Sequence, residues 1–348
     1  MNIYKSRLLA CTFLIINFIS AAAQDIFSYE KEIANKENYT FEDIAFTIPD
    51  KKGTVTFTGT LIQPKTGFDK IVIIVPGSGR DTRNSHYKLT EAFLKNNIAV
   101  YRYDDRGTGK SGGTFSDANY TVSTMANELL SAFKAIKALP VLAQKKIGFL
   151  GHSQGGLVTM GAVKNGAVPD FLIQWAAPAQ KHGAFIMYQV VSGQNTFNDY
   201  FKGMGQDKKL EIMAAVHKVV EENPTDDDWQ LYKKIEKANK RSGYTRRDYE
   251  RFPYLTLSSE KDIVRQNFEP LYKSTTIPLL YIIGSNDTFA DPVAETQLLK
   301  TLGNKNTTIK IAQGLNHYLT GGILIQQTMY EIDGTAAADI VNWIMALK

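Results

Sequence analysis

Cysteine is nearly absent from this chain of 348 residues, since Cys11 is the only one. Because a disulfide needs two cysteines, this chain cannot form one within itself. The sequence also lacks clusters of metal-ligating side chains, internal repeats and low-complexity tracts. It therefore predicts neither a disulfide-linked scaffold nor a metal centre, and we expect no cofactor.

Strong charge of one sign is missing as well. The formal net charge is +5, and two of these charges belong to Lys5 and Arg7. Because the remaining excess is mild and spread out, no nucleic-acid partner is expected. Apolar residues make up 43% of the chain, which is enough for a large core, and α/β folds of this length often form one domain.

A hydrophobic run long enough to span a membrane is also absent, and the stretch that comes nearest to that length lies at the N-terminus. Lys5 and Arg7 precede the 12-residue apolar stretch Leu8–Ile19, and Ala21–Ala23 supplies small residues for cleavage. The stretch is shorter than the roughly 20 residues that span a bilayer. Residues 1–23 are therefore predicted to be a signal peptide, with no stable membrane insertion after its cleavage.

Residues 24–348 are predicted to be one exported domain. An uncleaved anchor and lipidation at Cys11 are the alternatives. The exported part has no cysteine, and one of its Asn-x-Ser/Thr triplets, Asn286-Asp287-Thr288, contains Asp287, a candidate functional residue discussed below, where a glycan would block the site. Both facts fit the bacterial periplasm better than eukaryotic secretion.

The most informative stretch that is present is Gly151-His152-Ser153-Gln154-Gly155. The strand candidate 145–150 precedes it, and a helical pattern follows from Gly156. Glycines on both sides let the backbone turn sharply, which exposes the Ser153 hydroxyl at the carboxyl end of the strand. A five-residue pattern can arise by chance, but this context favours Ser153 as a nucleophile.

A serine nucleophile needs a base, and the base needs an orienting group. His317 lies in a glycine-bearing loop after the strand candidate 307–311, in the chain order expected for a base. His152 is expected to point into the sheet. His217 lies on a stretch rich in lysine and glutamate, where a solvated histidine is the default. His317 is therefore the predicted base.

The orienting acid should follow a strand between the serine and the histidine. The run 278–283 is the most strand-like there, and Asp287 comes shortly after it. Asp291 is the rival, but an aspartate before Pro292 commonly caps a helix, here the candidate 292–302. Asp287 is the predicted acid.

An oxyanion hole is predicted from a second glycine-containing loop. The β-branched run 71–75 is typical of a buried parallel strand and leads into Pro76-Gly77-Ser78-Gly79. Backbone N–H groups of Ser78 or Gly79, together with that of Gln154, are predicted to bind the oxyanion.

Two glycine-rich stretches mimic nucleotide-binding loops without completing them. Gly77-Ser78-Gly79 is followed by Thr82 where a dinucleotide fingerprint needs its third glycine, and Gly107-Thr108-Gly109-Lys110-Ser111 lacks the first glycine of a phosphate loop. Nearby, Asp105 and Arg106 are predicted to brace the loop beside the serine through hydrogen-bonded ion pairs.

Strand and helix patterns alternate along most of the chain. The ranges 41–48 and 54–62 are predicted antiparallel strands, and strand–helix alternation follows. The helix predicted over 121–138 places Met125, Leu129, Phe133 and Ile136 on one face. Such alternation predicts a mostly parallel sheet with helices on both faces and a ligand site beyond the carboxyl ends of its strands.

Residues 181–270 break this rhythm, because they lack β-branched runs and show helical patterns. They are predicted to form a helical lid inserted between two strands. Its large side chains either line an acyl pocket or pack the lid onto the core, and both interpretations stay open. These side chains are Phe185, Met187, Tyr188, Phe197, Tyr200 and Phe201.

Taken together, these motifs resemble an α/β-hydrolase from about Phe41 to the C-terminus, least so between about 181 and 270. The stretches 76–83, 103–111 and 151–156 are similar to those of a bacterial carboxylesterase subgroup with a GSG oxyanion loop. That subgroup has a proline after the GSG and acidic residues flanking the arginine. This chain departs from it with Arg80, Thr82 and Asn84.

The resemblance implies an α/β-hydrolase fold and hydrolysis of a small carboxylic ester through an acyl-enzyme. A prolyl-oligopeptidase-like peptidase or an acyltransferase would use the same parts, although no propeller domain is present. The non-enzyme alternative is a catalytically silent hydrolase fold that serves as a binding module. Such proteins usually lose the serine or the histidine, and this chain keeps Ser153, Asp287 and His317.

Overall fold

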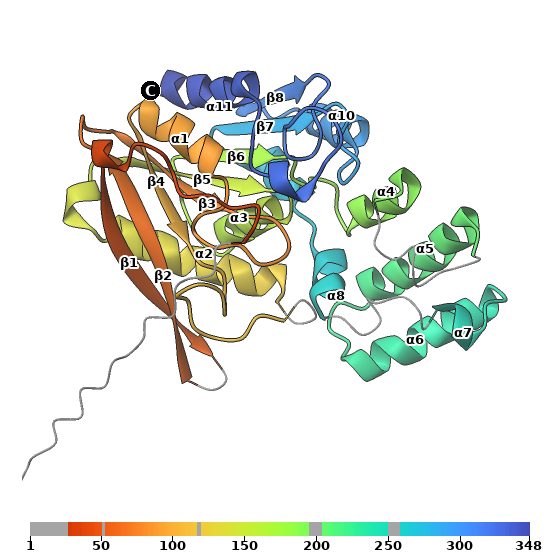
Figure 1. Cartoon of the computed structure of the whole chain (residues 1–348). Helices are drawn as coiled ribbons and strands as arrows, with labels where there is room; N and C mark the ends of the chain where they lie inside the picture. Colours follow the sequence, from red (N-terminus) through yellow and green to blue (C-terminus); the bar gives the residue numbers. More distant parts are fainter. Residues whose placement is uncertain (1–26, 51–52, 117–119, 195–203, 250–257) are drawn as a thin grey trace, which may run out of the picture.

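The computed structural model in Figure 1 describes residues 27–50, 53–116, 120–194, 204–249 and 258–348, so the predicted signal peptide lies outside it. The strands form one eight-stranded sheet in the order β1-β2-β4-β3-β5-β6-β7-β8. β2 pairs antiparallel with β1 and β4, and every later pairing is parallel. The mostly parallel sheet predicted from the alternating patterns is therefore confirmed.

The strands lie where the apolar runs predicted them. The first two strands form a hairpin and pair with each other along all 12 residues of each strand. Both are longer than the predicted ranges 41–48 and 54–62. β3 to β7 are buried almost throughout, as strands covered on both faces must be. The bounds are β1 Tyr39–Asp50, β2 Gly53–Pro64, β3 Lys70–Val75, β4 Ile98–Tyr103, β5 Lys146–His152, β6 Phe171–Trp175, β7 Leu279–Gly284 and β8 Thr307–Ala312.

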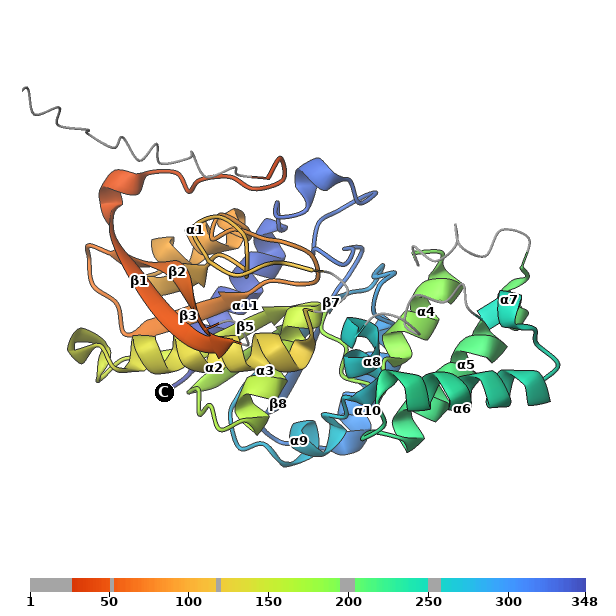
Figure 2. The ribbon, with the colours of Figure 1, turned by 90° about the horizontal axis from the view of Figure 1, so that it is seen from below.

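Helices cover both faces of the sheet. α1 and α11 pack together on one face, and α2 and α3 pack together on the other (Figures 1 and 2). The predicted apolar face of α2 is buried, and the Thr121 hydroxyl caps the helix by accepting a hydrogen bond from Thr124 N. The bounds are α1 Tyr87–Lys95, α2 Val122–Lys137, α3 Gln154–Lys164, α9 Glu269–Ser274, α10 Pro292–Leu302 and α11 Gly334–Ala346.

A helical insertion, defined here as α4 to α8, lies between β6 and β7 within the range predicted for the lid. Figures 1 and 2 show it as a lobe beside the sheet. Its bounds are α4 Ala184–Ser192, α5 Gln206–Glu222, α6 Asp228–Arg241, α7 Arg246–Tyr249 and α8 Ser258–Arg265. None of the helices in the described residues is long and apolar enough to cross a membrane.

The expectation of a solvated His217 is wrong, because this side chain is buried on α5. It lies on the face of the helix that carries Met213 and Val220 and packs within the insertion. The helical spacing was the better guide, since these residues follow one stripe. The charged residues of the same stretch occupy the other face.

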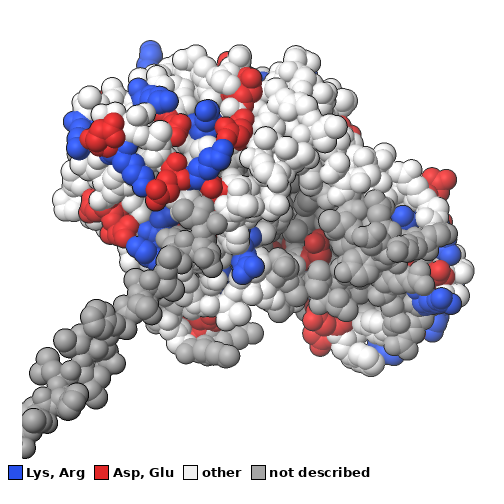
Figure 3. All heavy atoms as spheres, in the orientation of Figure 1, with Lys and Arg blue, Asp and Glu red and all other residues white. Residues whose placement is uncertain are grey.

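Charges on the main body are mixed in sign. On the face shown in Figure 3, lysine and arginine side chains are interspersed with aspartate and glutamate. This agrees with the even spread of charge in the sequence. The absence of a nucleic-acid partner stays a prediction.

Candidate active site

Ser153 lies at a sharp turn between β5 and α3. Its backbone has φ 54° and ψ −124°, a conformation that costs a non-glycine residue of order 1–3 kcal/mol and clusters at functional sites. The glycines around it are required by close approach, because a Cβ on Gly155 would collide with the carbonyl oxygen of Pro76. On Gly156 it would collide with Ala177. The turn predicted from the sequence is therefore present.

His317 and Asp287 are joined by a buried hydrogen bond. His317 Nδ1 lies 2.8 Å from Asp287 Oδ2, with side chains 4% and 0% exposed. The other carboxylate oxygen accepts from the N–H groups of Phe289 at 2.7 Å and Ala290 at 2.9 Å. With its proton on Nδ1, the neutral imidazole presents the lone pair of Nε2, as a general base must.

Trp175, at the end of β6, connects the serine to the histidine. Its carbonyl oxygen accepts from Ser153 N at 2.8 Å, and its indole Nε1 donates to the carbonyl oxygen of His317 at 3.2 Å. In the described residues Ser153 Oγ makes no hydrogen bond to His317. Such contacts are often long in ligand-free sites and tighten when substrate binds.

The two candidate acids have different partners. Asp291 accepts from the N–H groups of Val293 at 2.9 Å and Ala294 at 3.1 Å, which caps α10. Asp287 is the aspartate that contacts the histidine. Asp287 thus contacts the candidate base, and Asp291 caps a helix, as the sequence predicted.

The GSG loop runs directly past the serine. A Cβ placed on Gly77 would lie 3.3 Å from Ser153 Cβ and 3.8 Å from its Oγ. The three predicted oxyanion residues, Ser78, Gly79 and Gln154, line one cavity of about 130 Å³. Its other lining residues are Phe115, Tyr120, Met125, Ser259, Glu260 and Ile263.

Among its described residues, the insertion contributes to this cavity through α8, and Phe185, Met187 and Tyr188 do not line it. Phe185 and Met187 pack against the core, which is the second of the two interpretations. Tyr188 donates from its hydroxyl to the carbonyl oxygen of Asp287 at 2.9 Å. The remaining three, Phe197, Tyr200 and Phe201, lie outside the described residues.

Among the described residues, Glu260 is the one carboxyl group that lines the cavity. It lies in the first turn of α8 and is partly buried. Desolvation raises its pKa to about 7, because burial disfavours the charged form, and a cation or hydrogen-bond donor that entered the cavity would lower the pKa again.

His152 points into the fold, as expected. Its Nδ1 lies 3.1 Å from Nε2 of His86, and its ring centroid lies 5.2 Å from that of His317. Burial lowers the pKa of His86 to about 3 and that of His152 well below the usual range. Both rings are therefore neutral at pH 7, and they support the base without adding charge.

The prediction for Asp105 and Arg106 is half wrong. Arg106 forms ion pairs with Glu128 at 2.6 Å and Asp50 at 2.8 Å. Asp105 instead accepts a hydrogen bond from the backbone N–H of Asp81 at 2.8 Å, and burial raises its pKa well above the usual range. The difference arises because Asp105 faces other carboxyl groups in a buried cluster rather than a cation.

Sequence reasoning missed several residues that contact the site. The Phe289 ring stacks on His317 with centroids 4.6 Å apart, and Ser192 Oγ of α4 donates to the carbonyl oxygen of Thr288. The position of Phe289, two residues after the candidate acid, was an available signal. Ser192 and Glu260 offered none, because they reach the site from the insertion. Within the described residues no group of histidine, cysteine, aspartate or glutamate side chains could hold a metal ion.

Comparison with known families identifies the chain. It belongs to the family described as serine aminopeptidase, S33, whose sequence profile matches residues 67–240. No curated protein matches it. The chain is an α/β-hydrolase, as its motifs suggested.

Solved structures share its fold at low sequence identity. The Pyrococcus furiosus esterase Pf2001 is 18% identical, with a TM-score of 0.54 over 91% of this chain and 96% of that chain. The esterase from Exiguobacterium antarcticum is 15% identical, with a TM-score of 0.51 over 86% and 99%. The α/β hydrolase GrgF from Penicillium sp. sh18 is 15% identical, with a TM-score of 0.54 over 88% and 97%.

Proposed function

We propose that this α/β-hydrolase is a serine esterase that cleaves small carboxylic esters through an acyl-enzyme. The observation that carries the proposal is the 2.8 Å bond between His317 and Asp287 at the same edge of the sheet as the strained Ser153. A nucleophile, a base and an orienting acid in this chain order are the parts of an acyl-transfer site.

In the proposed mechanism Ser153 Oγ attacks the ester carbonyl carbon while its proton passes to His317 Nε2. The oxyanion that forms accepts hydrogen bonds from the N–H groups of Gln154 and of Ser78 or Gly79. The imidazolium, stabilised by Asp287, then protonates the departing alcohol. A water molecule, deprotonated by the same histidine, attacks the acyl-enzyme. The imidazolium then returns this proton to Ser153 Oγ as the acyl–oxygen bond breaks, and the acid product leaves.

We also propose that the protein is exported to a bacterial periplasm, without stable membrane insertion after cleavage. The proposal rests on the basic, apolar and small-residue pattern of residues 1–23. N-terminal sequencing of protein recovered from a bacterial host tests it. A start near Gln24 is expected, and a lipid on Cys11 would contradict it.

A p-nitrophenyl ester panel of graded acyl length tests the esterase proposal. Turnover is expected for short esters and should vanish in Ser153→Ala. A fluorophosphonate probe should add once to the wild-type protein and not to this variant, as mass spectrometry can show. Absence of both turnover and labelling would favour the silent binding module, and labelling that persists in the variant would exclude Ser153.

A second candidate, aminopeptidase activity, is favoured by one observation, the Glu260 carboxyl in the cavity beside the serine. A carboxylate there would attract the free amine of an aminoacyl substrate, in keeping with the description of the family. Aminoacyl p-nitroanilides tested beside the esters separate the two functions. If the amine is bound, Glu260→Gln should raise KM for aminoacyl substrates and leave simple esters unaffected.

A further inference from the structure

The segment Phe27–Ile33, called the N-terminal arm here, lies against the loop that continues from the GSG motif. Tyr29 donates from its hydroxyl to the carbonyl oxygen of Arg80 at 2.8 Å. Glu30 Oε1 accepts from Thr82 N at 2.6 Å, and its Oε2 accepts from the Thr82 hydroxyl at 2.7 Å. The arm therefore binds the loop one to three residues after Gly79.

Glu30 is well suited to hold a loop. It is 5% exposed, and Oε2 also accepts from the backbone N–H of Phe27 at 3.1 Å, so its carboxylate has three donors. Buried carboxylates that accept several charge-assisted hydrogen bonds fix the geometry of their partners. A neutral side chain of the same shape has only one acceptor oxygen and cannot satisfy these three donors.

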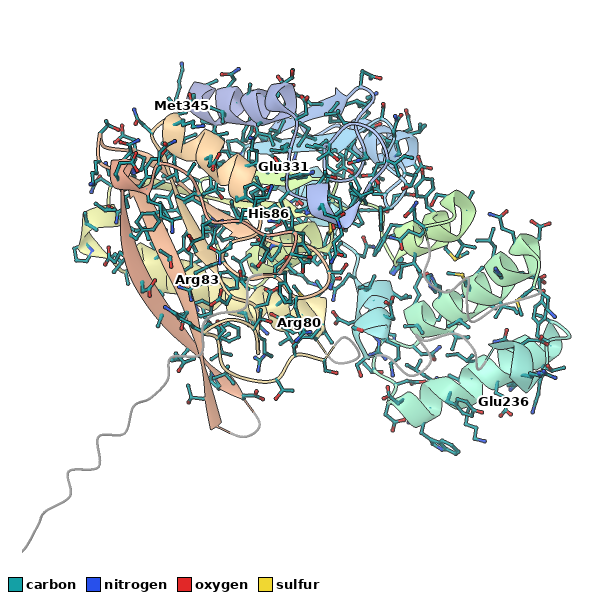
Figure 4. All side chains as sticks on the ribbon, viewed as in Figure 1. Arg80, Arg83, His86, Glu236, Glu331 and Met345 are labelled. Carbon is teal, nitrogen blue, oxygen red and sulfur yellow. The ribbon has the colours of Figure 1, made fainter. Side chains whose placement is uncertain are left out.

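The arm also reaches the wall of the cavity beside Ser153. The guanidinium of Arg80 lies 5.8 Å from the ring centroid of Phe27 and 5.7 Å from that of Phe115. Phe115 lines the cavity. Figure 4 shows Arg80 and Arg83 on the loop that leads from β3 toward His86 at the start of α1.

These contacts explain the departures from the carboxylesterase subgroup. Thr82 supplies both the N–H and the hydroxyl that bind Glu30, and its Oγ1 accepts from Asn84 N at 3.1 Å. Arg80 supplies the cation between two aromatic rings. The unusual residues after the GSG therefore form the surface on which the arm is seated.

We propose that Glu30 and Tyr29 are positioning residues that hold the GSG loop, and with it the oxyanion-binding N–H groups, in place for catalysis. The loop is anchored by β3 on one side. On the other side the arm holds Arg80 and Thr82, while Asp105 and Asp104 accept from the backbone N–H groups of Asp81 and Arg83. This inference rests on the proposed function, because it assigns the arm a part in oxyanion stabilisation at Ser153.

The test compares Glu30→Gln with Ile33→Ala in the full chain. Ile33 is the buried apolar anchor of the same arm and does not contact the GSG loop through a hydrogen bond. Misplacement by about 1 Å can cost about 100-fold in rate, and we expect the loosened loop in Glu30→Gln to lower kcat and the rate of fluorophosphonate labelling by about 10-fold, with KM unchanged. Ile33→Ala should lower the melting temperature at least as much while retaining both rates. Glu32→Gln, at an exposed position of the arm, is the neutral control.

The outcomes separate this inference from the proposed function. Labelling of Glu30→Gln at the wild-type rate would overturn the positioning role while leaving the esterase proposal intact. Equal loss of rate in Ile33→Ala and Glu30→Gln would also overturn it, because the arm would then act through stability alone. A wild-type protein that does not react with the probe at all would overturn the esterase proposal and this inference with it.

Discussion

The sheet and the helical insertion differ in how they are held together. β3 to β7 are almost wholly buried, and Ser153 and Asp287 follow the ends of two of these strands. The helix α6 of the insertion instead buries only Leu231, Ile235 and Asn239 among its 14 residues. Parallel strands covered on both faces are buried on both sides, whereas an amphipathic surface helix is buried along one stripe only.

The two regions supply different parts of the candidate site. The residues proposed to react are placed by strand ends and by a strained turn, and the insertion adds Glu260 to the cavity wall. The two regions meet at α4, where the side chains of Tyr188, Gln189 and Ser192 donate to backbone carbonyl oxygens of residues 287–289. The insertion is thus tied to the loop that carries the candidate acid.

The sharpest way to test the role of the sheet is to remove its acid. Asp287→Asn would leave the imidazole in the wrong tautomer, which costs about 10⁴ in kcat in the serine-protease example from which this estimate is taken. Asp291→Asn removes a helix cap worth about 1 kcal/mol and should retain turnover. Ester kinetics and thermal melting of both variants provide the measurement. A dead Asp291 variant beside an active Asp287 variant would place the acid four residues later.

The contact between the regions should have a smaller effect. Tyr188→Phe removes the hydroxyl that binds the Asp287 carbonyl, and one hydrogen bond is worth about 1 kcal/mol, so kcat is expected to fall by about fivefold. Val191→Ala on the exposed side of the same helix is the control and should leave kcat unchanged. Equal rates in both variants would show that the insertion does not support the acid.

The loop after β3 should contribute less to the free energy of unfolding as pH rises. Burial, with Glu30 nearby, raises the pKa of Asp81 from 3.8 to about 8, so the folded state holds a proton that the unfolded state releases. The stability from this proton is complete below pH 3.8 and is lost as pH rises through about 8. Asp81→Asn does not titrate, and its melting temperature relative to wild type should increase from pH 5 to pH 8. A constant difference would argue against a protonated Asp81.

The insertion should instead lose stability as pH falls. Of the changes predicted here, this one should alter the stability of the whole protein least. Burial lowers the pKa of His217 from 6.5 to about 4, so the unfolded state binds the proton first as pH falls. The stability from the neutral ring is complete above pH 6.5 and is lost as pH falls through about 4. Hydrogen exchange in α5 should therefore accelerate from pH 7 to pH 5 beyond its intrinsic pH dependence. His217→Asn should remove that extra change, and strands β3 to β7 serve as the internal control.

Local patterns were enough to predict most of the fold and the candidate catalytic residues. The strands were visible as β-branched runs: the predicted range 71–75 lies within β3, and the predicted helix 292–302 agrees with α10. Ser153 was marked by the glycines that its turn requires. Asp287 and His317 were marked by their places after strands, because parallel strands bring their carboxyl ends to one edge.

Contacts between side chains far apart in the sequence depend on tertiary packing. Glu30 and Thr82 are 52 residues apart, and Tyr188 and Asp287 are 99 apart, so nothing local indicates either contact. The burial of His217 and the carboxyl cluster around Asp105 depend likewise on what each packs against. A turn or a strand is a property of neighbouring residues and leaves a pattern in the sequence. The partner of a buried polar group is set by how the helices and strands pack, which such patterns do not record.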